Sequence, residues 1–235
     1  LCLDHASAHH ADLVVISTGN QDEGGLEFQK FPPAGIPYAV LNQLTKEEPY
    51  SPSISPEHDK MVRDGLAQAR KVFFTSKNNH QVMEQRLECS IPHWEQIFNP
   101  LDIPPGEPLP MPDLSTGIQI AFPANILFVH KGHDILLEVM SMDKWRNRSV
   151  TINLYGKGED QDKVSRILED RSISNVHLRG FIQADEIWKQ NHALLLASRM
   201  EGQSLALIGA MIASRVPIVT AVGGSAEVIE DNHSG

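Results

Sequence analysis

The residues best suited to chemistry lie in a polar turn at residues 198–204, which separates two apolar segments. Residues 193–197 form an apolar run typical of a buried strand, and residues 205–214 have the pattern of a helix. A turn from a parallel strand into a helix leaves backbone N–H groups at a positive dipole end, which favours an anion. Glu201 adds an acceptor for sugar hydroxyls. Because ligands of open α/β sheets bind beyond the carboxyl ends of strands, the turn predicts a site for a phosphate and a polyol together.

The rest of the chain alternates strands and helices, which predicts an α/β fold with doubly wound parallel sheets. A Pro-rich linker at residues 101–117 separates residues 1–100 from residues 118–235, and its composition opposes regular structure. Strands are expected at residues 12–17, 36–41, 72–76, 119–123, 150–155, 176–178, 193–197 and 217–220. Helices are expected at residues 57–70, 78–87, 134–140, 160–170, 185–191 and 205–214.

Composition is that of an ordinary globular protein, and it excludes several classes of function. The formal net charge of −10 argues against a nucleic-acid surface. No apolar run reaches the roughly 18 residues of a membrane span. Cys2 and Cys89 lack the spacing of a metal site or a disulfide, which predicts free thiols in a reducing compartment. Because the first residue is Leu1 and residues 232–235 are turn-like, we expect a piece of a longer protein.

Several short motifs follow one another in an order and at spacings that resemble one protein family. In the second segment they are KGHDILL (131–137), LYGKG (154–158), NVHLRGF (175–181), SRMEG (198–202), and TAVGG (220–224) with Glu227. The pairs at 145–146, 187–188 and 191–192, and residues 15–20, 35–38 and 99–100 in the first segment, fit the same pattern. Together they resemble the GT-B glycosyltransferases of family 4 (glycosyl transferases group 1), in a bacterial subgroup.

This resemblance implies two Rossmann-like domains. The first would be the later half of an acceptor domain at residues 1–100, and the second a truncated donor-binding domain at residues 118–235. It implies retaining transfer of a hexose from a nucleotide-diphosphate sugar to a glycan or lipid-linked acceptor. Leaving-group stabilisation and positioning would carry the reaction. No cofactor or metal is expected beyond the nucleotide sugar, and the expected location is the cytoplasm, including the inner membrane face.

The resemblance also implies a role for individual residues of the second segment. Catalytic residues are not assigned, because the matching part of the acceptor domain is absent from this sequence. The donor diphosphate is expected at Lys131, Asn125, Ser204 and Leu205; the sugar at Glu201, Gly202 and Gln203; and the nucleotide at Gly156, Gly158, Phe181, Ile182 and Gly209.

Three positions depart from the family pattern and keep a second hypothesis open. Gly209 stands where the family has a ribose-binding Glu, Asn125 where it has an Arg, and Ala221 where it has an Asp. Glycine has no side chain to bind ribose, and Asn supplies no charge to a diphosphate. The alternative is therefore a degenerate glycosyltransferase-like binding module. A sugar epimerase of the same fold would share residues 223–225 and Glu227.

Each assigned residue also has a purely structural interpretation. Lys131 alone is typical of a solvated loop, and Glu201 of a helix cap. Gly156 and Gly158 alone are typical of turns. The tryptophans and two histidines are expected to be structural, namely Trp94, Trp145, Trp188, His177 and His192.

Overall fold

The computed structural model of this 235-residue chain describes residues 11–20, 28, 31, 35–46, 49, 54–100 and 108–235. Cys2 and residues 101–107 of the Pro-rich linker therefore lie outside the described residues. The chain divides into two compact units. The first is Leu1–Asn99 with Met200–Gln203, and the second is Pro100–Arg199 with Ser204–Gly235.

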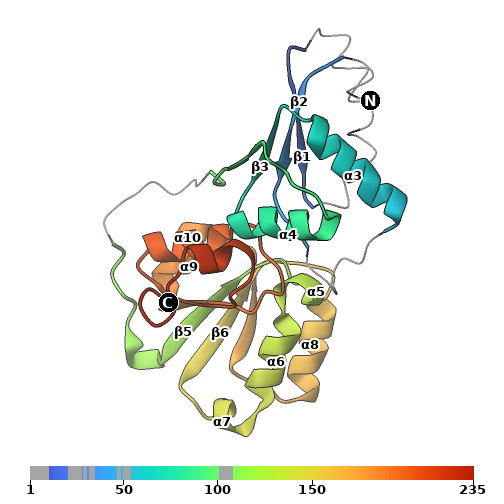
Figure 1. Ribbon diagram of the computed structural model, residues 1–235. Helices are drawn as coiled ribbons and strands as arrows, with labels where there is room; N and C mark the ends of the chain where they lie inside the picture. The colour runs from blue at the N-terminus through green and yellow to red at the C-terminus, as the bar shows by residue number, and fades with distance from the viewer. Residues whose placement is uncertain are drawn as a thin grey trace. The chain divides into compact units, whose positions relative to one another are not determined.

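The first unit contains a parallel sheet whose described strands follow chain order, β1-β2-β3-β4 (Figure 1). Its strands are β1 (Val14–Thr18), β2 (Tyr38–Asn42), β3 (Lys71–Phe74) and β4 (Trp94–Gln96). The helices whose bounds the structure describes in this unit are α3 (Pro56–Gln68) and α4 (Lys77–Leu87). Ser55 and Ser76 begin these helices, and each side chain accepts a hydrogen bond from the backbone N–H three residues on, at 3.1 Å. Tyr38, Val72, Phe74 and Met83 lie in the core beneath them.

The second unit contains a five-stranded parallel sheet in the order β7-β6-β5-β8-β9. Its strands are β5 (Ile118–Pro123), β6 (Val150–Tyr155), β7 (Val176–Gly180), β8 (Ala193–Leu196) and β9 (Val216–Val219). The chain enters at the centre, moves outward to β7, and returns to β8 on the other side of β5. This reversal creates a topological switch point between β5 and β8, where ligands of such sheets bind.

Helices cover both faces of the second sheet. The helices are α5 (Phe128–Lys131), α6 (His133–Ser141), α7 (Asp143–Arg146), α8 (Gln161–Asp170), α9 (Ala184–Gln190) and α10 (Leu205–Ile212). Right-handed crossovers place α6 and α8 on one face and, after the reversal, α9 and α10 on the other, as Figure 1 shows. Between the layers lie fully buried side chains such as Phe122, Leu154 and Leu194. None of the helices that the structure describes is both long and apolar enough to cross a membrane.

The predicted α/β class with two parallel sheets is confirmed, and each predicted strand and helix is present with its ends within two residues of the predicted ones. Among the strands and α-helices of the described residues, three were not predicted: β4, α5 and α7. Each has only three or four residues, which is too short for a hydrophobic period to repeat. Two short 3₁₀ helices, Leu114–Thr116 and Gly223–Glu227, complete the described elements.

Candidate functional site

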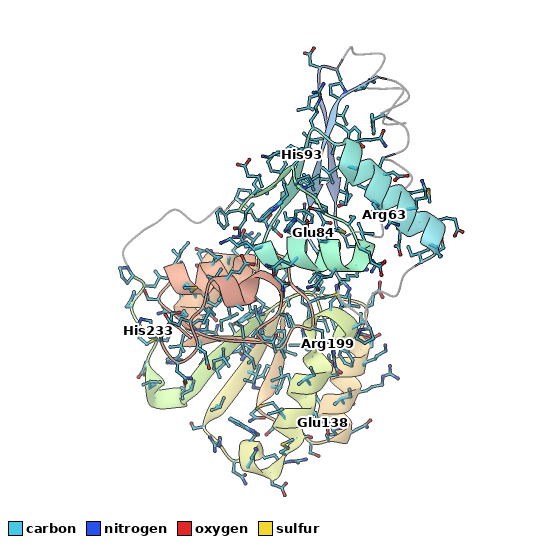
Figure 2. All side chains as sticks on the ribbon, viewed as in Figure 1. Arg63, Glu84, His93, Glu138, Arg199 and His233 are labelled. Carbon is cyan, nitrogen blue, oxygen red and sulfur yellow. The ribbon has the colours of Figure 1, made fainter. Side chains whose placement is uncertain are left out.

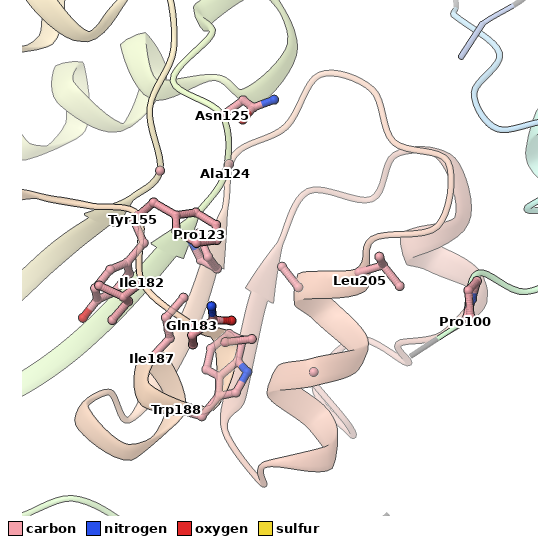
Figure 3. Close-up of a pocket in the computed structure, with 15 residues that line it drawn as sticks. Pro100, Pro123, Ala124, Asn125, Tyr155, Ile182, Gln183, Ile187, Trp188 and Leu205 are labelled. Carbon is pink, nitrogen blue, oxygen red and sulfur yellow. The ribbon is translucent and has the colours of Figure 1, made fainter. Parts of the chain in front are cut away.

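A pocket of about 410 Å³ opens at the carboxyl ends of β5, β6 and β7 (Figure 3). Helices α9 and α10 complete its wall. Its lining consists of Pro100, Pro123, Ala124, Asn125, Tyr155, Gly156, Phe181, Ile182, Gln183, Ala184, Ile187, Trp188, Leu205, Ala206 and Gly209. None of these lining residues, all from the described part of the second unit, has a side chain that is charged at neutral pH. The pocket therefore suits the uncharged, flat part of a ligand.

Half of the predicted site residues line this pocket. Phe181 is 71% exposed at its edge, whereas Gly209 is buried on α10. The lining residues that the sequence had assigned are Asn125, Gly156, Phe181, Ile182, Leu205 and Gly209. Lys131, Gly158 and Ser204 belong to the second unit but are not among the lining residues. Glu201, Gly202 and Gln203 group with the first unit.

The two glycines after β6 allow the loop after β5 to approach closely. A Cβ at Gly156 would lie 2.2 Å from the Ala124 carbonyl oxygen, and one at Gly158 would lie 2.2 Å from the Ile126 carbonyl oxygen. Backbone hydrogen bonds join the same loops, from Ala124 N to the Tyr155 carbonyl at 2.9 Å and from Ile126 N to the Lys157 carbonyl at 3.0 Å. The close packing of these loops therefore explains glycine at both positions, whether or not a ligand binds.

Lys131 lies at the end of α5, a short helix held at both ends by charged side chains. At its start, the Asp160 carboxylate accepts a hydrogen bond from Phe128 N at 2.7 Å. The Lys163 ammonium, 2.5 Å from Asp160, and this backbone bond hold the pKa of the Asp160 carboxyl below its usual range. Arg199, labelled in Figure 2, donates from its backbone to the His130 carbonyl near the other end of α5 at 2.8 Å, and from its guanidinium to the Phe128 carbonyl at 2.6 Å.

Arg199 also joins this corner to the first turn of α6. Its guanidinium forms two bonds with the Asp134 carboxylate, at 2.8 and 2.7 Å, and these bonds lower the pKa of Asp134. Between the two helices, Gly132 has φ +66°, and a Cβ there would lie 2.0 Å from the Ala197 carbonyl oxygen. We call Gly132, Asp134, Asp160 and Arg199 the α5 clamp. It fixes the helix that carries Lys131 against the segment that follows β8.

His133, which follows Gly132, is fully buried with its ring 4.5 Å from that of Phe122. Neither ring nitrogen has a hydrogen-bond partner among the described residues. Burial lowers the pKa of His133 from 6.5 to about 4. The imidazole is therefore neutral near pH 7, and it behaves as a core side chain rather than a proton donor.

The predicted sugar-binding residues pack within the first unit. A Cβ at Gly202 would lie 1.9 Å from the Gln43 carbonyl oxygen, so position 202 accepts only glycine without movement. The side-chain oxygen of Gln203 accepts a hydrogen bond from Asn99 N at 2.6 Å. Glu201 is 9% exposed. Ser204, in the second unit, begins α10 and accepts a hydrogen bond from Leu207 N at 3.4 Å, which is the behaviour of a helix cap.

Buried polar side chains support the α9 wall of the pocket. Asn191 donates to the Ile187 carbonyl at 2.8 Å and to the Tyr155 hydroxyl at 2.9 Å. Arg215, only 2% exposed, donates to the Trp188 carbonyl at 2.8 Å, and burial lowers its pKa. These supports and most of the apolar lining were not assigned from the sequence, because such residues are also typical of any core. His192 is structural, since its ring nitrogens bond Gln119 N and the Pro112 carbonyl at 3.0 and 3.1 Å.

Residues 117–235, which contain the α5 clamp and every lining residue of the pocket except Pro100, match the family of the group 1 glycosyl transferases. The chain belongs to this family. The match spans the whole second sheet and half of the chain.

Curated relatives match part of the chain. It is 31% identical over 105 residues to a poly(ribitol-phosphate) α-N-acetylglucosaminyltransferase from Staphylococcus aureus, covering 43% of this chain and 21% of the relative. It is 31% identical over 94 residues to the GtfA subunit of a UDP-N-acetylglucosamine–peptide N-acetylglucosaminyltransferase from Streptococcus parasanguinis, covering 40% and 18%. The matches thus span only about a fifth of each curated relative.

Solved structures resemble the chain over almost its entire length. A TarM structure from S. aureus that contains UDP aligns with a TM-score of 0.78 at 19% identity, covering all of this chain and 47% of TarM. HepE from Anabaena, in complex with UDP and glucose, aligns with a TM-score of 0.73 at 17% identity, covering 97% and 64%. At such identities the likeness shows the fold, which is that of the GT-B glycosyltransferases.

Proposed function

We propose that this chain carries the donor site of a retaining glycosyltransferase that transfers a hexose from a nucleotide-diphosphate sugar to a glycan or lipid-linked acceptor. The observation that carries the proposal is the uncharged pocket at the carboxyl ends of β5, β6 and β7, whose lining residues other than Pro100 lie in the segment that matches the family. TarM and HepE, which share the fold, have been solved with UDP. A uridine nucleotide is therefore the first donor to test. The setting we propose is the cytoplasm or the inner face of the membrane, where such donors and acceptors meet.

The proposed binding mode separates the neutral and charged parts of the donor. The nucleoside enters the pocket, where Phe181 offers an exposed aromatic face and Ile182 an apolar contact. The diphosphate is bound by the Lys131 ammonium, by backbone N–H groups at Ser204 and Leu205, and by the Asn125 amide. Such fixed positive groups stabilise a leaving diphosphate as charge develops on it. The sugar is assigned, from the resemblance, to Glu201, Gly202 and Gln203.

The reaction we propose needs no metal ion. Among the described residues, no group of three or more His, Cys, Asp or Glu side chains could hold one. Lys131 would supply the fixed charge that a divalent cation supplies in metal-dependent transferases. Nucleotide affinity is therefore expected to be the same with a chelator present.

One arrangement in the pocket supports the alternative, a binding module with impaired transfer. Asn125 and Gly209 both line the pocket, and neither brings a charge to it. Together with Ala221, they remove three of the polar contacts that the family pattern supplies. In this alternative the chain binds a nucleotide or glycan and depends on another chain for turnover.

The test is calorimetric titration of the 235-residue chain with UDP, GDP, ADP and their glucose conjugates, with and without a chelator. We expect micromolar binding of one nucleotide, on the order of −8 kcal/mol. Lys131→Ala should weaken the diphosphate about tenfold relative to the nucleoside, since one charged hydrogen bond contributes about 1.5 kcal/mol or more. Lys144→Ala, an exposed lysine of α7, is the matched control and should change neither.

Turnover separates the two proposals. Binding together with hydrolysis or transfer of the sugar supports the enzyme, whereas binding without turnover supports the module. If nucleotide binds only to the double variant Asn125→Arg with Gly209→Glu, the pocket retains its shape but has lost its contacts. If neither protein binds any of the nucleotides, the proposed donor site is wrong.

A further inference from the structure

Few polar side chains of the pocket are open to a ligand. Among the described lining residues, those with polar side-chain atoms are Asn125, Tyr155, Gln183 and Trp188. The Tyr155 hydroxyl already accepts a hydrogen bond from Asn191, and the indole nitrogen of Trp188 is buried. Asn125 and Gln183, by contrast, are exposed. The polar side-chain group that a molecule in the pocket can reach is therefore an amide.

Gln183 directly precedes helix α9, where a side chain commonly caps the helix, yet it does not act as a cap. Its side chain accepts no hydrogen bond from the first turn of α9, and its amide has no hydrogen-bond partner among the described residues. The backbone carbonyl of Gln183 instead accepts bonds from Glu186 N at 3.1 Å and Ile187 N at 3.3 Å. The helix thus begins through its main chain, and the amide remains available to a ligand.

The position of Gln183 associates it with the nucleoside rather than with the diphosphate. Figure 3 shows its amide among the lining side chains, whereas Asn125 lies apart from them at the top of the view. In the chain it follows Phe181 and Ile182, the two lining residues proposed above to contact the nucleoside. Asn125 is assigned with Lys131 to the diphosphate. Of the two exposed amides, Gln183 is therefore the one placed to contact the base.

The chemistry of an amide suits the edge of a nucleobase. Its NH₂ group donates and its oxygen accepts, so it can form two hydrogen bonds with a base that presents a carbonyl beside an N–H. Uracil has such an edge. A phosphate oxygen would use only the donor of the amide and would lack a counter-charge from the lining. Contacts of Phe181 and Ile182 with the faces of the ring would leave the edge of the base for the amide.

We infer that the side-chain amide of Gln183 recognises the polar edge of the nucleobase, donating to a base carbonyl and accepting from the adjacent base N–H. The inference rests on the proposed function and deepens it, because it assigns recognition of the base to a side chain that precedes α9. Gln183 is then a specificity-determining residue for the donor nucleotide.

The first test compares UDP binding by the unmodified chain and by Gln183→Met, which has a side chain of similar length but no amide. We expect affinity to fall about tenfold, as expected for two net hydrogen bonds at a site that water also reaches. Gln190→Met is the matched control. Gln190 is an exposed glutamine at the other end of α9 and is absent from the pocket lining, so its replacement should leave affinity unchanged.

Replacing UDP with 3-methyl-UDP tests whether the amide contacts the base. In this compound a methyl group replaces the hydrogen on the ring nitrogen between the two carbonyls. The unmodified chain should bind it about tenfold more weakly than UDP, and Gln183→Met should cause no further loss. If Gln183→Met weakens both ligands equally, the amide contacts another part of the nucleotide and the inference is wrong. If Gln183→Met binds UDP as tightly as the unmodified chain, the inference is also wrong, while the donor-site proposal stands.

A second variant, Gln183→Glu, keeps the size of the side chain and changes its hydrogen bonding. Near pH 7 a carboxylate only accepts, so it repels a carbonyl of uracil but can accept from the amino group of cytosine. The ratio of UDP affinity to CDP affinity should therefore fall about tenfold relative to the unmodified chain. The two bases have the same size, and the added charge repels both diphosphates alike. An unchanged ratio would overturn the inference, whereas failure of the unmodified chain to bind any nucleotide would instead reject the proposed function.

Discussion

The pocket and the α5 clamp both lie beyond the carboxyl ends of the second sheet, yet they treat polar groups in opposite ways. In the clamp, charged side chains are paired: Arg199 with Asp134, and Asp160 with Lys163. In the pocket, the lining is uncharged and one buried donor, Trp188 Nε1, has no partner among the described residues. Paired charges stabilise the fold, whereas an open, uncharged lining is available for contact with a ligand. Changes in the clamp should therefore reduce stability first, and changes in the pocket should reduce affinity first.

The largest effect is expected from adding one methyl group to the clamp, in Gly132→Ala. The backbone at Gly132 has φ +66°, and the new Cβ would lie 2.0 Å from the Ala197 carbonyl oxygen. Strain and the forced movement of the 197–199 segment should lower the free energy of unfolding by about 3 kcal/mol or more. Chemical denaturation monitored by circular dichroism measures the change.

Gly180→Ala, beside the pocket, is the matched control for this substitution. Gly180 has nearly the same backbone angle, φ +70°, but nothing lies within 4 Å of a Cβ there. Gly180→Ala should therefore lower the free energy of unfolding only by the conformational cost of the positive φ, about 1 kcal/mol. Equal losses in the two variants would contradict the view that close packing, rather than backbone angle alone, distinguishes the clamp from the pocket.

Removing the clamp's arginine, in Arg199→Ala, should have the next largest effect. The substitution leaves the Asp134 carboxylate and the Phe128 carbonyl without their guanidinium bonds. Because these groups are partly buried, the expected loss of unfolding free energy is about 2 kcal/mol. Arg171→Ala provides the comparison: its pair with Glu138, at 3.5 Å, is exposed and should contribute less than about 0.5 kcal/mol. If Arg199→Ala and Arg171→Ala unfold at the same denaturant concentration, the α5 clamp does not stabilise the fold.

The sequence alone predicts the strands and helices far better than it predicts the pocket and the α5 clamp. Strands such as residues 193–197 are recognisable because their apolar runs are long, whereas α5 has four residues and shows no period. The pairing of Arg199 with Asp134 joins residues 65 positions apart, and no local pattern predicts it. Trp188 looks like any core aromatic in the sequence. Its place in the pocket lining, and the missing partner of its indole nitrogen among the described residues, are seen only in the folded chain.

Lowering the pH should destabilise the fold near the α5 clamp, because His133 becomes protonated on unfolding. Its pKa is about 4 in the folded chain against an ordinary value of 6.5, so between these values the unfolded chain binds more protons. The contribution of His133 to stability is therefore complete above its pKa in the unfolded chain, and it is lost as the pH falls toward its pKa in the folded chain. From about pH 7 to pH 5 the expected loss is about 2 kcal/mol.

His133→Leu isolates this contribution from the other titrating groups. The variant removes the ring while keeping an apolar side chain of similar size against Phe122. Carboxylates such as Asp134 and Asp160 titrate lower, because their pKa values lie below the ordinary 3.8. Unfolding should then lose most of its dependence on pH between 7 and about 5. A variant that retains the full dependence would place its origin elsewhere, for instance at His177, whose pKa burial also lowers.

The smallest expected change in free energy, and the one that best separates the two regions, comes from Phe181→Ala. This ring lines the pocket but is 71% exposed, so its removal should change the free energy of unfolding by less than about 0.5 kcal/mol. Stacking of an aromatic ring on a base contributes about 1 kcal/mol or more, so nucleotide affinity should fall about fivefold. Leu114→Ala, 60% exposed and preceding β5 rather than following it, should alter neither quantity. A Phe181→Ala chain that loses stability but not affinity would assign this ring to the fold and remove the contrast between pocket and clamp.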